Sequence, residues 1–231
     1  MSENNPQYDV IVIGAGVAGL YQLFKLRQLK LKALVIEAGD NVGGTWYWNR
    51  YPGARFDSES WSYGYSFSKE LFEEWDWPEH FAAQPDTLRY LNYVADKFDF
   101  RRDIKFDRRV EACVFDQHNN LWTVRTNTKE EYVARFLITA LGPLSAFTLP
   151  NIEGRETFKG PAYHTARWPH EEVDFSGKRV GIIGTGACAI QTIQTIAKDV
   201  AHLTVFQRSP NWAAPLNNLS LIHISEPTRP Y

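Results

Sequence analysis

Residues 8–19 are Tyr-Asp-Val-Ile-Val-Ile-Gly-Ala-Gly-Val-Ala-Gly, and the predicted fold follows from this pattern. Its first half is an apolar run rich in β-branched residues, which is typical of a strand buried in a parallel sheet. Its glycines form a turn that leads into a helix predicted over about residues 17–29. A second short apolar run, residues 33–37, completes a βαβ unit.

Each part of the pattern Gly14-x-Gly16-x-x-Gly19 has a physical reason. Gly14 permits the tight turn, Gly16 lets the backbone approach a pyrophosphate, and Gly19 lets the helix pack closely on the strand. The helix N-terminus offers N–H groups and the positive end of its dipole to phosphates. Glu37 closes the next strand, where its carboxylate can accept both ribose hydroxyls. The pattern therefore predicts a dinucleotide site; the alternative is a tight strand–helix turn with no ligand.

The same order of elements returns in the last third of the chain. Gly184-x-Gly186-x-x-Ala189 follows a second apolar run and precedes a second helical segment, with alanine in the tolerated third position. The chain thus predicts the α/β class, as two tandem Rossmann-like dinucleotide-binding domains.

The second unit has no acidic residue at the end of its second strand, which leads into Gln207-Arg208-Ser209. A carboxylate there would repel a 2′-phosphate, whereas the planar guanidinium of Arg208 can pair with one. The second site is therefore predicted to select NADP over NAD. The alternative for Arg208 is a solvated loop cation.

Two dinucleotide sites in one chain suggest a flavin enzyme in which NADPH reduces FAD. A disulfide reductase would also have two sites, but it would need a redox cysteine pair near the first. The chain has two cysteines, Cys113 and Cys188, and no such pair. We interpret Cys188 as a small buried residue rather than a redox thiol.

The remaining elements are predicted from apolar periodicity and turn residues. All predicted strands and helices cover residues 8–14, 17–29, 33–37, 86–98, 109–115, 121–126, 132–140, 179–184, 187–198 and 203–206. Residues 39–84 lack a clear pattern, and irregular stretches of that length inside a domain are usually functional. Residues 149–178 are predicted to be a connector.

The second unit is predicted to be truncated. A doubly wound domain needs five or six strands, and two parallel strands with one helix cannot bury their apolar surface alone. Residues 219–231 resemble a translated sequencing adapter, so we expect the native sequence to end at about Asn218; the alternative is a short ordered tail. The predicted division is an FAD-binding segment over 1–148, a linker over 149–178 and the start of an NADP-binding domain over 179–218.

Composition is that of an ordinary globular protein. Apolar residues make up 44% and charged residues 23% of the 231 residues, and the formal charge is −2. The chain therefore has no excess of positive charge that would favour binding to nucleic acid or to an anionic membrane. Two cysteines supply neither a disulfide framework nor a four-ligand zinc site, so no metal is expected and a reducing cytoplasm is the expected location.

Three stretches of the sequence resemble one known protein family. Phe158-x-Gly160-x-x-x-His164-Thr165-x-x-Trp168-Pro169 matches the Baeyer–Villiger monooxygenase fingerprint. Residues 43–57 and 206–212 also resemble that family, and the likeness runs from about Tyr8 to Asn218, closest to the phenylacetone and cyclohexanone monooxygenase type. Related N-hydroxylating and flavin-containing monooxygenases share the glycine patterns but lack the Trp-Pro ending. Ala189 and Pro143 depart from the pattern of close relatives, which weakens any inference about substrate.

The resemblance implies an FAD- and NADPH-dependent monooxygenase. NADPH would reduce FAD, reduced flavin would add O2 to form a C4a-peroxyflavin, and the peroxide would convert a ketone into an ester or lactone. The protein would orient the flavin and keep water from it. The alternatives are a flavin N- or S-oxygenating enzyme and a non-catalytic flavin-binding fragment; the truncated chain is expected to be inactive alone.

The resemblance also implies which residues bind the cofactors. On the flavin side they are Gly14, Gly16, Gly19, Glu37, Thr45, Trp46, Trp48, Asp57, Tyr63 and Val110. On the NADP side they are Gly184, Thr185, Gly186, Ala189, Gln191, Arg208 and Ser209. Arg55 would reach NADP from the flavin side.

Asp57 and His164 are the residues to which the resemblance gives a part in the reaction. In relatives the matching Asp contacts an arginine that stabilises the charged flavin peroxide, and here that arginine would lie beyond Asn218. The alternative for Asp57 is a turn-capping role beside Pro52-Gly53. His164 is expected to couple domain rotation to cofactor position; a structural histidine is the alternative.

Overall fold

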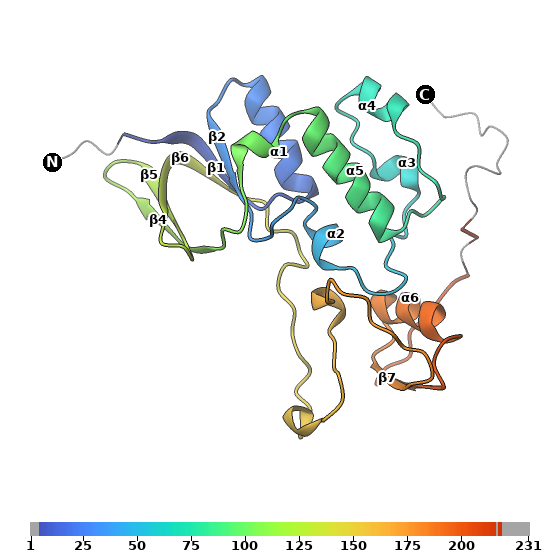
Figure 1. Ribbon diagram of the computed structural model, residues 1–231. Helices are drawn as coiled ribbons and strands as arrows, with labels where there is room; N and C mark the ends of the chain where they lie inside the picture. The colour runs from blue at the N-terminus through green and yellow to red at the C-terminus, as the bar shows by residue number, and fades with distance from the viewer. Residues whose placement is uncertain (1–4, 216, 219–231) are drawn as a thin grey trace. The chain divides into compact units, whose positions relative to one another are not determined.

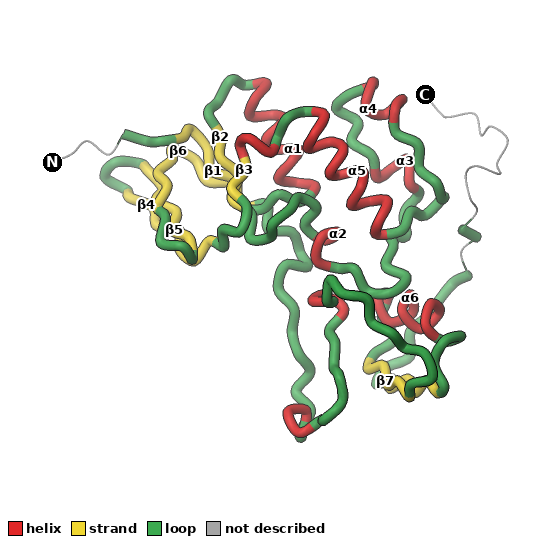
Figure 2. The backbone as a smooth tube through the Cα atoms, in the orientation of Figure 1, coloured by secondary structure: helices red, strands yellow, loops and turns green. Residues whose placement is uncertain are grey.

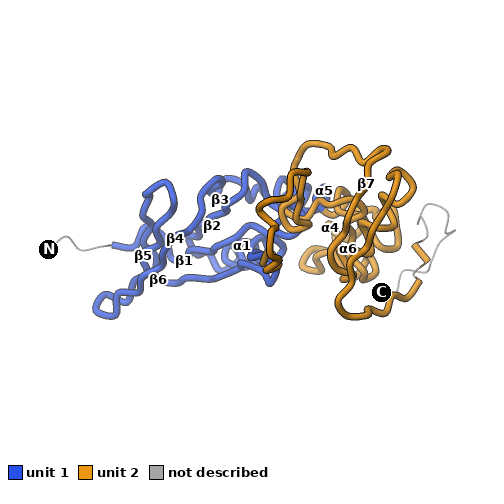
Figure 3. Tube along the Cα trace, turned by 90° about the horizontal axis from the view of Figure 1, so that it is seen from below, with its two compact units in different colours: residues 1–47, 88–147 blue, residues 48–87, 148–231 orange. Residues whose placement is uncertain are grey.

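The computed structural model describes residues 5–215, 217 and 218. The chain divides into two compact units, shown in different colours in Figure 3. The first unit comprises residues 1–47 and 88–147, and the second comprises residues 48–87 and 148–231. The predicted FAD-binding segment over 1–148 does not coincide with either unit, because residues 48–87 group with the later part of the chain.

The first unit is built on a six-stranded mixed sheet in the order β3-β2-β1-β6-β5-β4. Its strands are β1 (Tyr8–Ile13), β2 (Ala33–Ile36), β3 (Ile104–Lys105), β4 (Val110–Asp116), β5 (Leu121–Thr126) and β6 (Glu131–Thr139). β1 pairs in parallel with β2 and β6, and β2 pairs in parallel with β3. β4, β5 and β6 form an antiparallel meander (Figures 1 and 2).

Helix α1 (Val17–Gln28) follows β1 and packs on the parallel strands, as Figure 1 shows. Leu20 and Leu23 are fully buried and Leu26 nearly so, because a three-residue spacing keeps them on one face. Helix α5 (Gln84–Lys97) likewise buries Leu91 and Val94. The predicted βαβ unit and the α/β class are confirmed.

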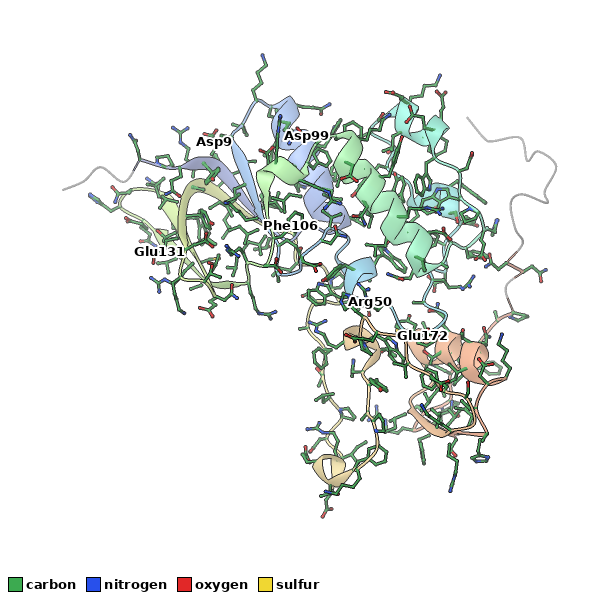
Figure 4. The ribbon with its side chains drawn as sticks, viewed as in Figure 1. Asp9, Arg50, Asp99, Phe106, Glu131 and Glu172 are labelled. Carbon is green, nitrogen blue, oxygen red and sulfur yellow. The ribbon has the colours of Figure 1, made fainter. Side chains whose placement is uncertain are left out.

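The C-terminal turn of α1 is fastened by Arg27. Its guanidinium donates to the Asp103 carboxylate at 2.9 Å and to the carbonyls of Phe98 and Asp99 at 2.6 and 2.7 Å. It also lies over the ring of Phe100, 5.1 Å from its centroid. Asp103 belongs to the short 3₁₀ turn η1 (Arg101–Asp103), and Asp99 is labelled in Figure 4.

One sequence prediction for the first unit is wrong in part, and one short strand was not predicted. β6 was predicted to be a buried strand, but its second half is open, with Phe136 59% exposed. β5 pairs with β6 only up to Ala134, so from Arg135 onward one edge of β6 has no neighbour among the described residues. The two-residue strand β3 was not predicted, because it is too short to show a period.

Residues 39–84 are not wholly irregular, which corrects a second prediction. They contain three short helices: α2 (Thr45–Trp48), α3 (Ser60–Tyr63) and α4 (Lys69–Glu74). Ser68 caps α4 by accepting from the N–H of Leu71 at 3.2 Å. Helices of one or two turns leave no repeating apolar spacing, and therefore the sequence did not reveal them.

The second unit contains the later βαβ motif. β7 (Arg179–Ile183) and β8 (His202–Phe206) are parallel, and α6 (Ala187–Ile196) connects them, as predicted. Ile183 and Phe206 are 64% and 56% exposed, because no further strand joins this two-stranded sheet within the described residues. The connector holds only two 3₁₀ turns, η2 (Arg155–Thr157) and η3 (Thr165–Arg167). The predicted tail, residues 219–231, lies outside the described residues.

Within the described part of the chain, no helix combines the length and the apolar character needed to cross a membrane.

Candidate functional site

The first glycine loop is shaped by close backbone approaches. Gly14 adopts a φ of +103°, and a Cβ on it would lie 2.7 Å from the carbonyl oxygen of Ala140. A Cβ on Gly19 would overlap the carbonyl oxygen of Gly14. A Cβ on Gly16 would lie 3.2 Å from the Cα of Gly44. The predicted turn and the close helix–strand packing are therefore both present.

Helix α1 begins directly after Gly16, and no side chain caps its N-terminus. A helix of twelve residues carries a partial positive charge at this end. The loop and the helix end together form a cradle with the chemistry that a pyrophosphate requires.

Glu37 lies beside this loop, as predicted. Its side chain is buried; Oε2 accepts from the N–H of Ala15 at 2.6 Å and Oε1 accepts from the N–H of Gly39 at 2.8 Å. Burial raises the pKa of Glu37, and the backbone hydrogen bonds oppose that rise. The carboxylate holds the loop in place, and a carboxylate with one bond on each oxygen can still accept hydroxyl groups.

The second glycine loop repeats the backbone conformation of the first. Gly184 has the same φ of +103° as Gly14, and Gly186 precedes α6 with φ −72° and ψ 178°, close to the values at Gly16. No side chain caps α6. In contrast to Gly14, a Cβ on Gly184 would meet nothing within 4 Å.

Residues after β8 close over this second loop. Gln207 donates to the hydroxyl of Thr185 at 3.1 Å, and Asn211 donates to the carbonyl of Thr185 at 2.6 Å. Arg208 and Ser209 are exposed at the end of β8, on the sheet edge where Gly184 bonds to the carbonyl of Phe206. Arg208 makes no hydrogen bond or ion pair with any residue that the structure describes, so its guanidinium is available to a ligand.

Asp57 lies in the second unit, on a loop that also carries Arg55. Both residues line a cavity of about 630 Å³ together with Thr185 and Gln191. Asp57 is exposed, and its carboxylate accepts no hydrogen bond from the described part of the chain. The turn before it is closed by the N–H of Ala54 bonding to a backbone carbonyl at 3.0 Å, so Asp57 does not cap it. The structure thus brings predicted flavin-side and NADP-side residues to one cavity.

Arg55 is held on one side by residues that the sequence did not reveal. Its guanidinium donates to Glu79 at 2.9 Å and to the carbonyl of Phe81 at 3.3 Å. Asn218 donates to Glu79 at 2.8 Å and accepts from the N–H of Phe81 at 2.9 Å. Asn218 is 137 positions from Phe81 in the chain, and a separation of that size leaves no sequence signal.

Tyr51 is a further residue that sequence reasoning missed. Its side chain is buried and its hydroxyl donates to Oε1 of Gln191 at 2.8 Å. Burial first, and then the neighbouring Cys188 and Asp57, raise the pKa of Tyr51. Tyr51 is therefore a neutral hydrogen-bond donor at physiological pH.

Other predicted cofactor residues are placed as follows. Thr45 and Trp46 lie in α2, where Trp46 is buried and Thr45 is partly exposed. Val110 is the first residue of β4 and packs against the cluster that includes Ile11 and Val124. In the second unit, Tyr63 stacks on Phe56 with centroids 4.3 Å apart, and Arg167 lies 5.0 Å over the ring of Trp48. Ala189 lies in the first turn of α6. Their contact with a cofactor stays a prediction.

His164 precedes η3 and caps it. Its Nδ1 accepts from the N–H of Ala166 at 3.1 Å. This contact is local and favours the structural alternative, while the predicted coupling role stays a prediction. Cys188 is partly buried in the first turn of α6, and Cys113 is exposed on β4; both are free thiols.

Comparison with known proteins shows a family match. A model described as pyridine nucleotide-disulphide oxidoreductase matches residues 11–230. An acetone monooxygenase (methyl acetate-forming) of Gordonia is 50% identical over 212 residues, covering 92% of this chain and 40% of the relative. A phenazine N-monooxygenase of Lysobacter antibioticus is 45% identical over 216 residues, covering 93% and 40%. A Baeyer-Villiger monooxygenase of Pseudooceanicola batsensis is 47% identical over 212 residues, covering 91% and 39%.

A solved structure of a monooxygenase also matches this chain. An oxidized steroid monooxygenase bound to NADP superposes with a TM-score of 0.89 at 54% identity, covering 93% of this chain and 41% of that one. The chain therefore spans about two-fifths of the length of the relatives that it matches. The resemblance to Baeyer–Villiger monooxygenases predicted from the sequence is confirmed.

Proposed function

The chain belongs to the pyridine nucleotide-disulphide oxidoreductase family, and on that premise we propose that it supplies the FAD-binding and NADP-binding loops of a Baeyer–Villiger monooxygenase. The whole protein would use NADPH and O2 to insert one oxygen atom next to a ketone carbonyl, giving an ester or lactone. Because the chain spans two-fifths of its relatives, we propose that it is not active by itself.

The duplicated glycine loop is the observation that carries this proposal. Gly14 and Gly184 share a φ of +103°, and each loop opens an uncapped helix. Two loops of this shape in one chain provide one pyrophosphate cradle for a flavin dinucleotide and one for a nicotinamide dinucleotide.

The residues present fit both cofactors. Gly16 and the α1 N-terminus would hold the FAD pyrophosphate, and Glu37 would accept its ribose hydroxyls through the free lone pairs of its carboxylate. When bound, the flavin supplies hydride acceptance from NADPH and activation of O2. Gly186 and the α6 N-terminus would hold the NADP pyrophosphate, and exposed Arg208 would pair with the 2′-phosphate.

Asp57 would act from the cavity wall. An exposed carboxylate without a hydrogen-bond partner in the described chain is available to orient a cationic side chain. In the full-length protein we assign that cation to an arginine outside this chain, which would stabilise negative charge on the bound flavin. His164 would position the fingerprint segment by capping η3.

A second candidate function is supported by a specific observation. The phenazine N-monooxygenase is 45% identical to this chain, so oxygen transfer to a nitrogen atom is compatible with the same loops. A third candidate, a flavin-binding fragment without activity, applies to the chain taken alone. We also keep a cytoplasmic location and the absence of a nucleic-acid partner as proposals from charge and cysteine content.

The test is to purify the full-length protein that contains this chain. Bound FAD should give a yellow protein that oxidises NADPH in the presence of O2 and a ketone, with an ester or lactone as the product identified by mass spectrometry. An N-oxide formed from a phenazine, with ketones left unchanged, would establish the second candidate. A colourless protein that takes up no added FAD would refute both.

A further inference from the structure

The side-chain amide of Gln191 bonds to both backbone polar groups of Arg55. Its Nε2 donates to the carbonyl of Arg55 at 3.0 Å, and its Oε1 accepts from the N–H of Arg55 at 3.4 Å and from the Tyr51 hydroxyl at 2.8 Å. This is the pair of bonds that a neighbouring strand would make. The sequence predicted that Gln191 binds NADP, but here its amide is engaged by the loop that leads to Asp57.

A second contact joins the same loop to the same helix. Gly53 adopts a φ of +79°, and a Cβ on it would overlap the hydroxyl of Thr195 and lie 2.6 Å from the carbonyl oxygen of Gln191. The loop backbone therefore lies directly on the backbone of α6, with no room for a side chain between them. The loop is fixed to α6 at two points, by an amide and by a glycine.

The opposite side of the loop is also held. The carbonyl of Ala54 accepts from the N–H of Gln84 at 2.8 Å, and Arg55 forms an isolated bridge with Ala83. Phe56, the next residue, is buried and stacks on Tyr63. The loop backbone therefore lies between α6 on one side and residues 83–84 on the other, with hydrogen bonds to both.

α6 begins at the second glycine loop, and Gln191 lies in its second turn. A dinucleotide held at Gly186 would contact one end of α6, while Gln191 holds the backbone two residues before Asp57. Thr185 of the second glycine loop, Gln191 and Asp57 all line the same cavity. A small shift of α6 would therefore move Asp57 as well.

We propose that Gln191 is a positioning residue that transmits NADP binding at the second glycine loop to the carboxylate of Asp57. This inference rests on the proposed function. It assigns Gln191 a role distinct from direct contact with the dinucleotide, because the amide is occupied by Arg55 and Tyr51.

Hydrogen exchange of the full-length protein tests the connection without relying on catalysis. Gln191→Met keeps the length of the side chain and removes its hydrogen bonds, so the peptide covering Tyr51–Asp57 should exchange about five- to tenfold faster. Adding NADP⁺ should slow exchange of that peptide in the wild type and leave it unchanged in Gln191→Met. Lys198→Met, at an exposed position just beyond the end of the same helix, is the matched control and should behave as the wild type.

Kinetics separate positioning from binding. A positioning role predicts that Gln191→Met lowers kcat about tenfold while the KM for NADPH changes less than about threefold. Tyr51→Phe, which removes one of the bonds, should show a smaller effect in the same direction. A raised KM with kcat retained would instead make Gln191 a direct ligand of NADP and overturn the inference.

Failure of this inference can be told from failure of the proposed function. Equal exchange of the Tyr51–Asp57 peptide in the wild type and in Gln191→Met refutes the connection, even if the protein is a working monooxygenase. Absence of bound flavin and of NADP⁺ binding in the wild type refutes the proposed function. Faster exchange in Gln191→Met would even then show that the hydrogen bonds between Gln191 and Arg55 hold the loop.

Discussion

Replacing Glu37 by glutamine should loosen the first glycine loop without changing the size of the side chain. The carboxylate accepts the N–H of Ala15 at 2.6 Å and the N–H of Gly39 at 2.8 Å, and only 5% of the residue is exposed. An amide keeps one acceptor oxygen but turns its NH2 group toward the other N–H. One hydrogen bond is thereby replaced by two donors that face each other.

The magnitude follows from that single lost bond. A hydrogen bond to a charged group contributes about 1.5–3 kcal/mol, and removing a buried charge offsets part of its loss. We expect the free energy of unfolding to fall by about 1–2 kcal/mol. The glutamine would also accept the FAD ribose hydroxyls less well, and each 1.4 kcal/mol lost is tenfold in affinity, so FAD should bind about 10- to 100-fold more weakly.

The assay is a titration of FAD-free protein with FAD, followed by flavin fluorescence, together with denaturant unfolding of the same preparations. Asp40→Asn is the matched control, because it removes an exposed negative charge three residues away. The control should bind FAD as the wild type does. Wild-type affinity in Glu37→Gln would show that neither loop order nor ribose binding depends on this carboxylate.

Further predictions concern four properties of the protein. Arg208→Ala should raise the KM for NADPH by at least about tenfold and that for NADH less than about twofold, and equal changes in steady-state kinetics would reject the 2′-phosphate role. Asp57→Asn should slow product formation about tenfold without altering FAD content measured by absorbance, and an unchanged rate would leave Asp57 outside the reaction. Arg27→Ala should lower the free energy of unfolding by about 2 kcal/mol in denaturant titration, whereas Lys25→Ala should lower it by no more than about 0.5 kcal/mol. Burial raises the pKa of Glu37, so its protonation stabilises the folded protein below about pH 4.5, and this contribution is lost as the pH rises through the pKa of the folded state. The free energy of unfolding of the FAD-free wild type should therefore fall more over that pH range than that of Glu37→Gln. Parallel pH profiles of the two proteins would contradict this prediction.

Local chemistry made the two glycine loops predictable from the sequence. The glycine at φ +103° and the helix that starts three residues later depend only on neighbours within the motif, so the motif itself indicates both features. Glu37 was predictable for the same reason, because strand length alone brings it to the edge where Gly14 lies. Long periodic elements such as α1 and α5 were likewise visible in their apolar spacing.

Contacts between distant segments were not predictable. Gln191 bonds to Arg55 across 136 positions and Asn218 bonds to Phe81 across 137, and nothing in either neighbourhood marks the partner. The sequence placed Gln191 in an NADP-binding run because its position in the motif is known, whereas its hydrogen bonds are decided by which loop packs on α6. Polar side chains of this kind are assigned by tertiary structure alone.

The grouping of residues 48–87 with the later part of the chain has a physical cause in these same bonds. A two-stranded sheet with one helix cannot bury the apolar face of that helix, and α6 needs another surface to cover it. The loop around Gly53 supplies backbone at van der Waals distance, and the amide of Gln191 satisfies the polar groups that this packing would otherwise leave unpaired. The contact that completes the second unit is thus also the contact that places Asp57 at the cavity, so stability and positioning depend on the same few atoms.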